Sequence, residues 1–231
     1  MTEIGAERRA AGRRRDPLIE PRVMAAAIEV YAREGWGGFT FESVARESGV
    51  GKPAIYRRWA NREDLLLRAF ETMHFPKAQD LGSIRADLLD YAYQWVEWYS
   101  DQSRGIAAVR LETDRLANPV LTGLYEDLIA LRVEAARAIT RRGIKRGEVA
   151  ATVRSATIIE LLVGAMQTHW ILVPEAQLPT LYRHFTAYAE NVVDIIVCGL
   201  QAVAPPAPAA DGSPGQARAV LAGRLRPDLT T

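Results

Sequence analysis

Residues 39–70 read FTFESVARESGVGKPAIYRRWANREDLLLRAF and contain helix start and stop signals in close succession. The pattern predicts one short helix over about residues 41–48, which Gly49 ends. A second short helix follows a Gly-Val-Gly turn and covers about residues 52–59. Two short helices joined by a glycine-containing turn predict a helix-turn-helix.

The helix starts in this stretch depend on side-chain caps. Thr40 is a favourable N-cap for the first short helix, although Glu42 and Ser43 match a capping box poorly. Asn61 caps a further helix, and Asp64 occupies the position three residues later. These caps predict that the short helices start at fixed positions.

The second short helix begins KPAIYRR, with three basic residues and no acid. A helix of this length is not stable alone, so flanking helices must pack on it and leave its polar side exposed. Lysine and arginine bind phosphates and guanine edges, and tyrosine and alanine contact phosphates or thymine methyls. A solvated charged face is the alternative reading. The residues expected to face DNA are Lys52, Ala54, Tyr56, Arg57 and Arg58.

Composition limits the function classes. The chain has 231 residues, of which 48% are apolar and 25% charged, so we expect one or two folded domains. Its formal net charge is only +1, which argues against a non-specific binder of nucleic acid. Any attraction to DNA must therefore come from a local basic patch.

Cysteine use and hydropathy indicate a cytoplasmic protein. Cys198 is the single cysteine, which excludes a disulfide within the chain. The N-terminal residues carry arginines without an apolar segment after them, unlike a secretory signal. Polar residues interrupt the most apolar stretch, residues 156–173, which favours a buried helix over a membrane span.

The periodicity predicts an all-α protein with no strand. Residues 1–17 form a basic arm, in which Arg13, Arg14 and Arg15 suit contact with the DNA minor groove or backbone. We expect a DNA-binding domain over 18–75 and a helical regulatory domain over 83–203. Residues 204–231 form a tail rich in proline, alanine and glycine, which cannot bury enough surface to fold. The helices expected outside the helix-turn-helix span about 18 or 21–34, 61–73, 83–100, 104–117, 119–142, 152–173 and 179–203, with a loop over 35–38 and a cap at Asn118.

Residues 22–70 resemble the DNA-binding domain of the TetR family of bacterial transcriptional regulators. The chain reads AAAIEVYAREGWGGFTFESVARESGVGKPAIYRRWANREDLL, against a family pattern T-x-x-x-(I/V)-A-x-x-(A/S)-G-V-S-x-x-x-(I/L)-Y-x-(H/R)-(F/W)-x-(S/N)-(K/R). The match covers about fifty residues without a gap. The family's remaining chain is an all-helical regulatory domain, usually dimeric, which agrees with the helices expected from residue 83.

The resemblance assigns expected roles to single residues. It implies that Thr40 and Arg62 meet phosphates, that Lys52 and Pro53 lie against base edges, and that Tyr56 and Arg58 hold the backbone; Arg57 reaches either a base or a phosphate. Gly51 stands where the family commonly has serine. This departure removes a hydroxyl contact to the DNA backbone.

The last two long helices are apolar on more than one side, so they need partners on both sides. One reading is that they are core helices of a monomer. The family resemblance implies instead a homodimer through a two-fold four-helix interface over about residues 152–203. The two apolar stripes are Ile159, Leu162, Val163, Met166 and Trp170, and Leu181, Phe185, Tyr188, Val192 and Ile195.

Aromatic residues with polar tips predict a pocket for an aromatic or lipophilic effector. The alternative is that these rings fill the core between long helices. The three histidines and Cys198 show no metal spacing, and no phosphate-binding glycine loop or nucleophile elbow occurs, so we expect no metal and no cofactor. The predicted ligand-binding residues are Trp95, Trp98, Tyr99, Tyr125, His169 and Trp170.

Together these features predict a dimeric, ligand-responsive repressor that binds a palindromic DNA operator and has no enzymatic activity. The alternative is a small helical enzyme with a basic N-terminal segment. Catalysis requires a polar cluster, and the regulatory half offers only scattered candidates, Glu112, Asp114 and His169.

Overall fold

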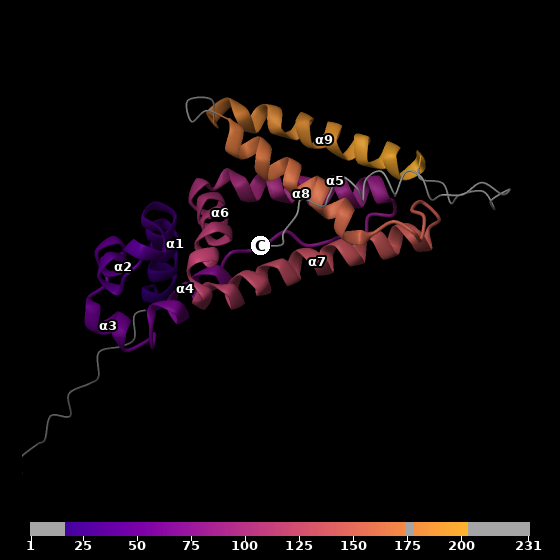
Figure 1. Ribbon diagram of the computed structural model, residues 1–231. Coiled ribbons are helices and arrows are strands. Elements are labelled where there is room, and N and C mark those ends of the chain that lie inside the picture. The colour runs from indigo at the N-terminus through magenta and orange to yellow at the C-terminus, as the bar shows by residue number, and fades with distance from the viewer. Residues whose placement is uncertain (1–16, 174–177, 203–231) are drawn as a thin grey trace, which may run out of the picture.

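The computed structural model describes residues 17–173 and 178–202, and every regular element in these ranges is a helix (Figure 1). The predicted all-α fold is therefore confirmed. The basic arm with Arg13–Arg15 and the tail 204–231 lie outside the described residues. The N-terminal unit comprises α1 (Ile19–Gly38), α2 (Phe41–Ser48), α3 (Lys52–Tyr56) and α4 (Arg62–Glu71). The C-terminal unit comprises α5 (Ile84–Ser100), α6 (Gln102–Ala117), a 3-10 helix (Pro119–Leu121), α7 (Thr122–Lys145), α8 (Ser155–Leu172) and α9 (Leu178–Ala202).

Helix α1 packs on α2 and α4 to form the core of the N-terminal unit. The expected apolar stripe of α1 is buried, with Val23, Ala27, Val30 and Tyr31 all fully inaccessible to solvent. Gly35 interrupts the helix as expected, but the loop expected over the residues after it is wrong. The helical ribbon continues to Gly38 across a kink at Gly35, whose φ of 63° suits glycine.

The start of α2 also differs from the expectation. The Thr40 side chain accepts a hydrogen bond from the Ser43 N–H at 3.0 Å, and Ser43 Oγ accepts one from the Thr40 N–H at 2.9 Å. This is a capping box after all, because a serine hydroxyl at the third position replaces the usual glutamate. Gly49 ends α2 with φ 65°, as predicted, and Asn61 caps α4 by accepting from the Asp64 N–H at 2.7 Å.

Helix α5 is the centre of the C-terminal unit. It contacts α6, α7, α8 and α9, and Figure 1 shows α7 and α9 on opposite sides of it. Asn118 precedes Pro119 at the start of the 3-10 helix, as expected, but its side chain does not cap that helix; its Nδ2 donates to the Asp114 carbonyl at 2.7 Å, at the end of α6. No described helix is long and apolar enough to span a membrane.

Helix α6 holds the end of α1. The Asp114 carboxylate accepts hydrogen bonds from the Trp36 N–H at 2.9 Å and the Tyr31 hydroxyl at 3.1 Å. Arg110, one turn earlier on α6, donates from Nε to the Ala32 carbonyl at 2.6 Å. These bonds satisfy backbone groups that the kink at Gly35 removes from the helix ladder.

Residues 72–83 connect the two units without an α-helix, and a buried carboxylate fixes their far end. Asp87 Oδ1 accepts from the Leu81 N–H at 2.7 Å, and its Oδ2 accepts from Arg142 and Arg146, each at 3.0 Å. Burial raises the pKa of the Asp87 carboxyl, but the Leu81 N–H and the two guanidinium groups together hold that pKa below its usual range. Asp87 thus links the end of the connector to α5 and to two arginines at the end of α7, while Gln94 of α5 bonds to Lys77 earlier in the connector.

Replacing Asp87 with asparagine tests this attachment. Asp87→Asn leaves two arginines without their buried partner, so we expect about 3 kcal/mol less stability at pH 7. Because the folded-state pKa of Asp87 is depressed, its contribution is present above the unfolded pKa of about 3.9 and is lost as pH falls through the folded value. Urea denaturation from pH 7 to pH 3 should show the difference between the two proteins shrinking below about pH 4.

The matched control is Asp194→Asn, which removes an exposed ion pair with Arg85 at 2.8 Å. Exposed pairs contribute little, so this variant should lose less than about 1 kcal/mol. Equal losses in the two variants at pH 7 would contradict the assignment of Asp87 as the attachment point.

Candidate nucleic-acid interface and effector cavity

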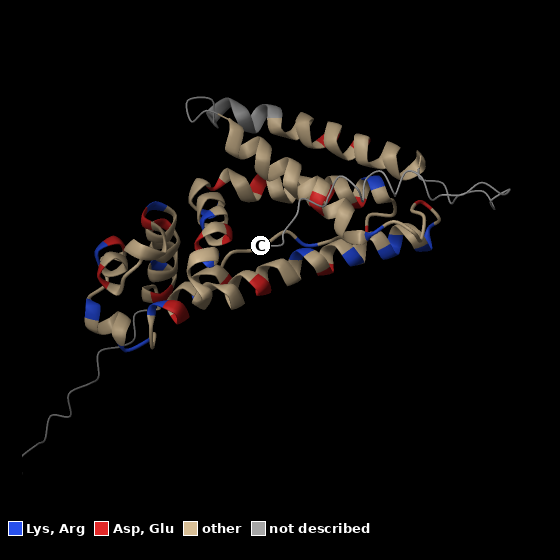
Figure 2. Cartoon of the chain, viewed as in Figure 1, with Lys and Arg blue, Asp and Glu red and all other residues tan. Residues whose placement is uncertain are grey.

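One side of helix α3 packs against the rest of the N-terminal unit, and the other side is exposed to solvent. Ile55 is fully buried and Trp59, in the turn after α3, is 5% exposed. Lys52, Pro53 and Arg57 are exposed, whereas Ala54 and Arg58 are half-buried. Figure 2 shows basic residues on α3 and the turn that follows it, at the outer end of the N-terminal unit. The predicted helix-turn-helix thus presents a short basic helix to solvent, although α3 ends at Tyr56 rather than near Trp59.

Two exposed side chains of α3 converge on Glu42, in the first turn of α2. The Tyr56 hydroxyl donates to Glu42 Oε1 at 3.1 Å, and Lys52 Nζ lies 3.4 Å from the same oxygen. The Tyr56 ring also meets Phe41 edge-on, with centroids 4.7 Å apart. Sequence reasoning did not identify Glu42 as part of this face, because its partners are distant in the chain. Lys52 is ten residues away and Tyr56 is 14 residues away. The one signal in the sequence that could have indicated its role is its position in the first turn of the helix before the glycine turn.

The other expected phosphate ligands already have partners inside the protein. Arg62, the first residue of α4, stacks over the Trp36 ring at 3.9 Å and donates from Nη1 to the Trp36 carbonyl at 3.2 Å. Arg58 donates from Nη1 to the Ala54 carbonyl at 3.0 Å. The Thr40 hydroxyl belongs to the capping box. Arg57 differs, because no described residue pairs with its guanidinium.

Four of the six predicted ligand-binding residues form one ring cluster in the C-terminal unit. Tyr99 lies at its centre, with centroids 5.6 Å from Trp95, 5.3 Å from Trp98 and 5.2 Å from Trp170. All four are buried, and burial raises the pKa of Tyr99 well above its usual range. The Nε1 atoms of Trp98 and Trp170 have no acceptor among the described residues. The cluster fills the core of the unit, and none of its four rings lines the cavity beside α4 or the groove between α8 and α9.

The remaining two lie apart from that cluster. His169 stacks on Tyr188 of α9 at 3.8 Å, and burial lowers the pKa of its imidazole. Tyr125 lies under the Arg115 guanidinium, 3.9 Å from its ring centroid. No group of three or more histidine, cysteine, aspartate or glutamate side chains in the described part of the chain could hold a metal ion.

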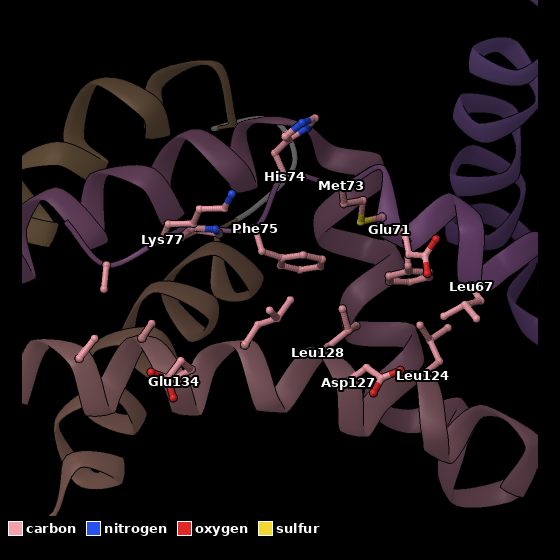
Figure 3. A pocket seen from close by; sticks show the side chains of 16 residues that line it. Leu67, Glu71, Met73, His74, Phe75, Lys77, Leu124, Asp127, Leu128 and Glu134 are labelled. Carbon is pink, nitrogen blue, oxygen red and sulfur yellow. The ribbon is translucent and has the colours of Figure 1, made fainter.

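A cavity of about 740 Å³ opens between α4, the connector and α7 (Figure 3). Phe75 reaches it from the connector, and Leu124 and Leu128 reach it from α7. Phe75 also packs against Trp98, with centroids 5.2 Å apart, so one ring separates the cavity from the ring cluster. Sequence reasoning missed this cavity because its walls include a segment interpreted only as a domain break. Its apolar lining consists of Leu67, Phe70, Met73, Phe75, Pro76, Ala78, Leu124, Leu128, Leu131, Ala135 and Ala138.

A helix-turn-helix with an exposed basic second helix, joined to an all-helical domain, defines a DNA-binding transcriptional regulator. Family models support this class along most of the chain. Residues 23–69 match the bacterial regulatory proteins of the tetR family, and residues 78–195 match the tetracyclin repressor-like C-terminal domain. The chain belongs to the TetR family. Members of this family regulate transcription and are not enzymes, so the alternative of a small helical enzyme is wrong.

Individual proteins are similar over different lengths. The HTH-type transcriptional regulator AqdR of Rhodococcus erythropolis is 27% identical over 172 residues, which cover 74% of this chain and 82% of AqdR. The DNA-binding transcriptional repressor TetR of Mycobacteroides abscessus is 34% identical over 70 residues, 29% of this chain and 37% of that protein. The crystal structure of FadR from Bacillus subtilis in complex with stearoyl-CoA superposes with a TM-score of 0.61 at 18% identity, covering 78% of this chain and 98% of FadR.

Arg62 and Arg57 should respond differently to truncation. Arg62→Ala removes the contact with the Trp36 ring and the bond to its carbonyl, so we expect a loss of about 1–2 kcal/mol in unfolding free energy. Arg57→Ala removes an exposed charge that no described residue pairs with, so it should change stability by less than about 0.5 kcal/mol. Urea denaturation of both variants measures this, and equal stabilities would show that Arg62 has no structural role.

Proposed function

We propose that this protein is a repressor, which binds a palindromic operator as a homodimer in the cytoplasm and dissociates from it when a lipophilic effector binds. The observation that carries the proposal is the exposed basic face of α3 on a helix-turn-helix. Lys52 and Pro53 lie against base edges in the major groove, and Arg57 and Tyr56 contact the backbone beside them. Thr40, Ala54, Arg58 and Arg62, with Arg13, Arg14 and Arg15 of the arm, complete the proposed DNA contacts.

Selection from a random duplex library tests this function. Two α3 helices related by a two-fold axis should select half-sites about 34–36 Å apart or a multiple of that distance. Lys52→Ala should alter the selected bases, whereas Arg57→Ala should weaken all sequences alike and reduce the salt dependence of binding. Failure of the unmutated protein to enrich a palindrome would refute the proposed function.

The dimer is proposed to form through the outer faces of α8 and α9. Within one protomer, Leu161 of α8 remains 56% exposed and Ile195 of α9 remains 64% exposed. Both line an apolar groove of about 490 Å³ between these helices, with Gly199 and Val192 beside them. A continuous apolar face on two adjacent helices favours association, and a second copy would complete a four-helix interface. The stripe that includes Val163 is already buried within the protomer.

A charge in that groove should separate the protomers. Ile195→Glu would leave a desolvated, unpaired carboxylate in the interface, so we expect a monomer at micromolar concentration and loss of palindrome binding. Leu116→Glu is the matched control, because Leu116 is 74% exposed on α6 and does not line this groove, so this variant should stay dimeric. Light scattering measures both, and an unmutated protein that is monomeric at that concentration would contradict the proposed dimer.

The effector is proposed to bind in the cavity between α4, the connector and α7. Its volume of about 740 Å³ lies within the range of pockets that enclose drug-sized molecules. Leu67 and Phe70 belong to the DNA-binding domain, whereas Leu128 belongs to the regulatory domain. A molecule that contacts both domains binds one arrangement of them better than another, which is the requirement for a switch.

The predicted aromatic residues enter this proposal as the inner wall of the effector site. Trp98 lies behind Phe75, and Trp95, Tyr99 and Trp170 continue the cluster inward. A shift of the Phe75 ring would open the cavity toward the unpaired indole N–H groups. An apolar molecule with an acceptor at one end suits this arrangement. Tyr125 and His169 belong neither to the cavity wall nor to the ring cluster behind it.

Binding of lipophilic compounds and of operator DNA, measured side by side, tests the effector site. The panel includes long-chain acyl-CoA esters, since FadR of Bacillus subtilis was crystallised with stearoyl-CoA. An effector should quench tryptophan fluorescence and weaken operator binding about 5–150-fold, and the operator should weaken effector binding by the same factor. Quenching without any change in operator affinity would refute the switch.

A variant locates the site. Leu131→Glu places a charge on the cavity wall, so we expect at least about a tenfold loss of effector affinity with operator binding retained. Leu116→Glu introduces the same charge outside the cavity and should leave effector affinity unchanged. Unaltered effector binding in Leu131→Glu would show that the effector binds elsewhere.

A further inference from the structure

Glu42 places a negative charge in the middle of the proposed DNA-binding face. Its side chain is 49% exposed, and Oε1 lies within 3.4 Å of both Lys52 Nζ and the Tyr56 hydroxyl oxygen. A hydrogen bond with its own backbone N–H, the Tyr56 hydroxyl and Lys52 lower the pKa of Glu42. The carboxylate is therefore ionised at neutral pH, close to where phosphates would approach.

Stability alone accounts for little of this arrangement. An acid in the first turn of a helix interacts favourably with the helix dipole, and an exposed ion pair adds little more. Repulsion from the DNA backbone would oppose binding at this position. A carboxylate in such a place is favourable for DNA binding when it accepts a hydrogen bond from a base.

The geometry points to Glu42 as a base-reading residue that specifies cytosine in each half-site. In the major groove, cytosine alone presents a donor, its N4 amino group, without an acceptor on the same base. Guanine presents only acceptors, adenine presents an acceptor beside its amino group, and thymine presents an acceptor and a methyl group. A carboxylate is repelled by all of these acceptors. Cytosine is therefore the base from which it can accept a hydrogen bond without such repulsion.

Lys52 complements this assignment. Guanine O6 and N7 are acceptors for lysine, and they lie across the base pair from cytosine N4. Lys52 Nζ lies 3.4 Å from the Glu42 carboxylate, so a donor and an acceptor stand side by side on the protein. The two side chains therefore match the two edges of one C·G pair, or of adjacent pairs. Through its hydroxyl, Tyr56 holds the carboxylate in place.

The inference rests on the proposed placement of α3 against DNA, and selection of duplexes by variants of the full chain tests it. Unmutated protein should select a fixed cytosine at one position in each half-site, with about a 10- to 100-fold loss of affinity when that base is changed. Glu42→Gln should lose this discrimination and favour adenine, because glutamine binds adenine N6 and N7 together. Glu42→Asp keeps the charge at the helix start but shortens the side chain, so it should also lose the cytosine preference while the melting temperature is retained.

Glu47→Gln is the matched control, because Glu47 lies in the last turn of α2 and pairs with Arg33 at 2.9 Å, away from α3. It should select the same cytosine as the unmutated protein. If Glu42→Gln selects the same cytosine, or binds all duplexes more tightly with unchanged preference, Glu42 only repels phosphates and the inference is overturned. An unmutated protein that selects no palindrome overturns the proposed function as well, whereas a palindrome unaffected by Glu42 overturns the inference alone.

Discussion

The Asp114 carboxylate fixes the relation between the two domains. It accepts from the Tyr31 hydroxyl and the Trp36 N–H on either side of Gly35, where φ is 63° and α1 loses its regular hydrogen bonds. A Cβ added at Gly35 would lie 3.0 Å from Arg110 Nη1, the flexible end of a side chain from α6, so the positive φ, more than lack of space, requires glycine here. The kink and the domain joint therefore depend on each other, because the joint supplies the partners that the kink removes from the helix.

Trp36 links this joint to the proposed DNA-binding face. Its N–H bonds to Asp114 of α6, while its ring and carbonyl contact Arg62 at the start of α4. The other half of α4 supplies Leu67 and Phe70 to the cavity wall. Helix α4 thus contacts the joint at one end and the cavity at the other. A proposed effector that moved α4 would act on both of these contacts, which gives the switch a physical basis.

Local signals in the sequence were sufficient to predict the helix-turn-helix. They could not predict contacts between residues that are far apart in the chain. Thr40, Gly49 and Asn61 act on residues within four positions, so their caps and turns could be predicted. Tyr31 and Asp114 lie 83 residues apart, and the sequence alone suggests Asp114 only as a scattered catalytic candidate. Four of the six predicted aromatic residues do lie together. Periodicity cannot tell whether such rings fill a core or line a cavity.

The charge of the chain explains why a dimer suits the proposed operator binding. The whole chain has a net charge of +1, and a carboxylate lies among the basic residues of α2 and α3, so one protomer has little non-specific attraction to DNA. Two linked domains raise affinity because the second binds at high effective concentration, provided that their spacing fits the half-sites. In the proposed dimer, weak single contacts would make this spacing decisive, so the proposed movement of α4 would be enough to release the DNA.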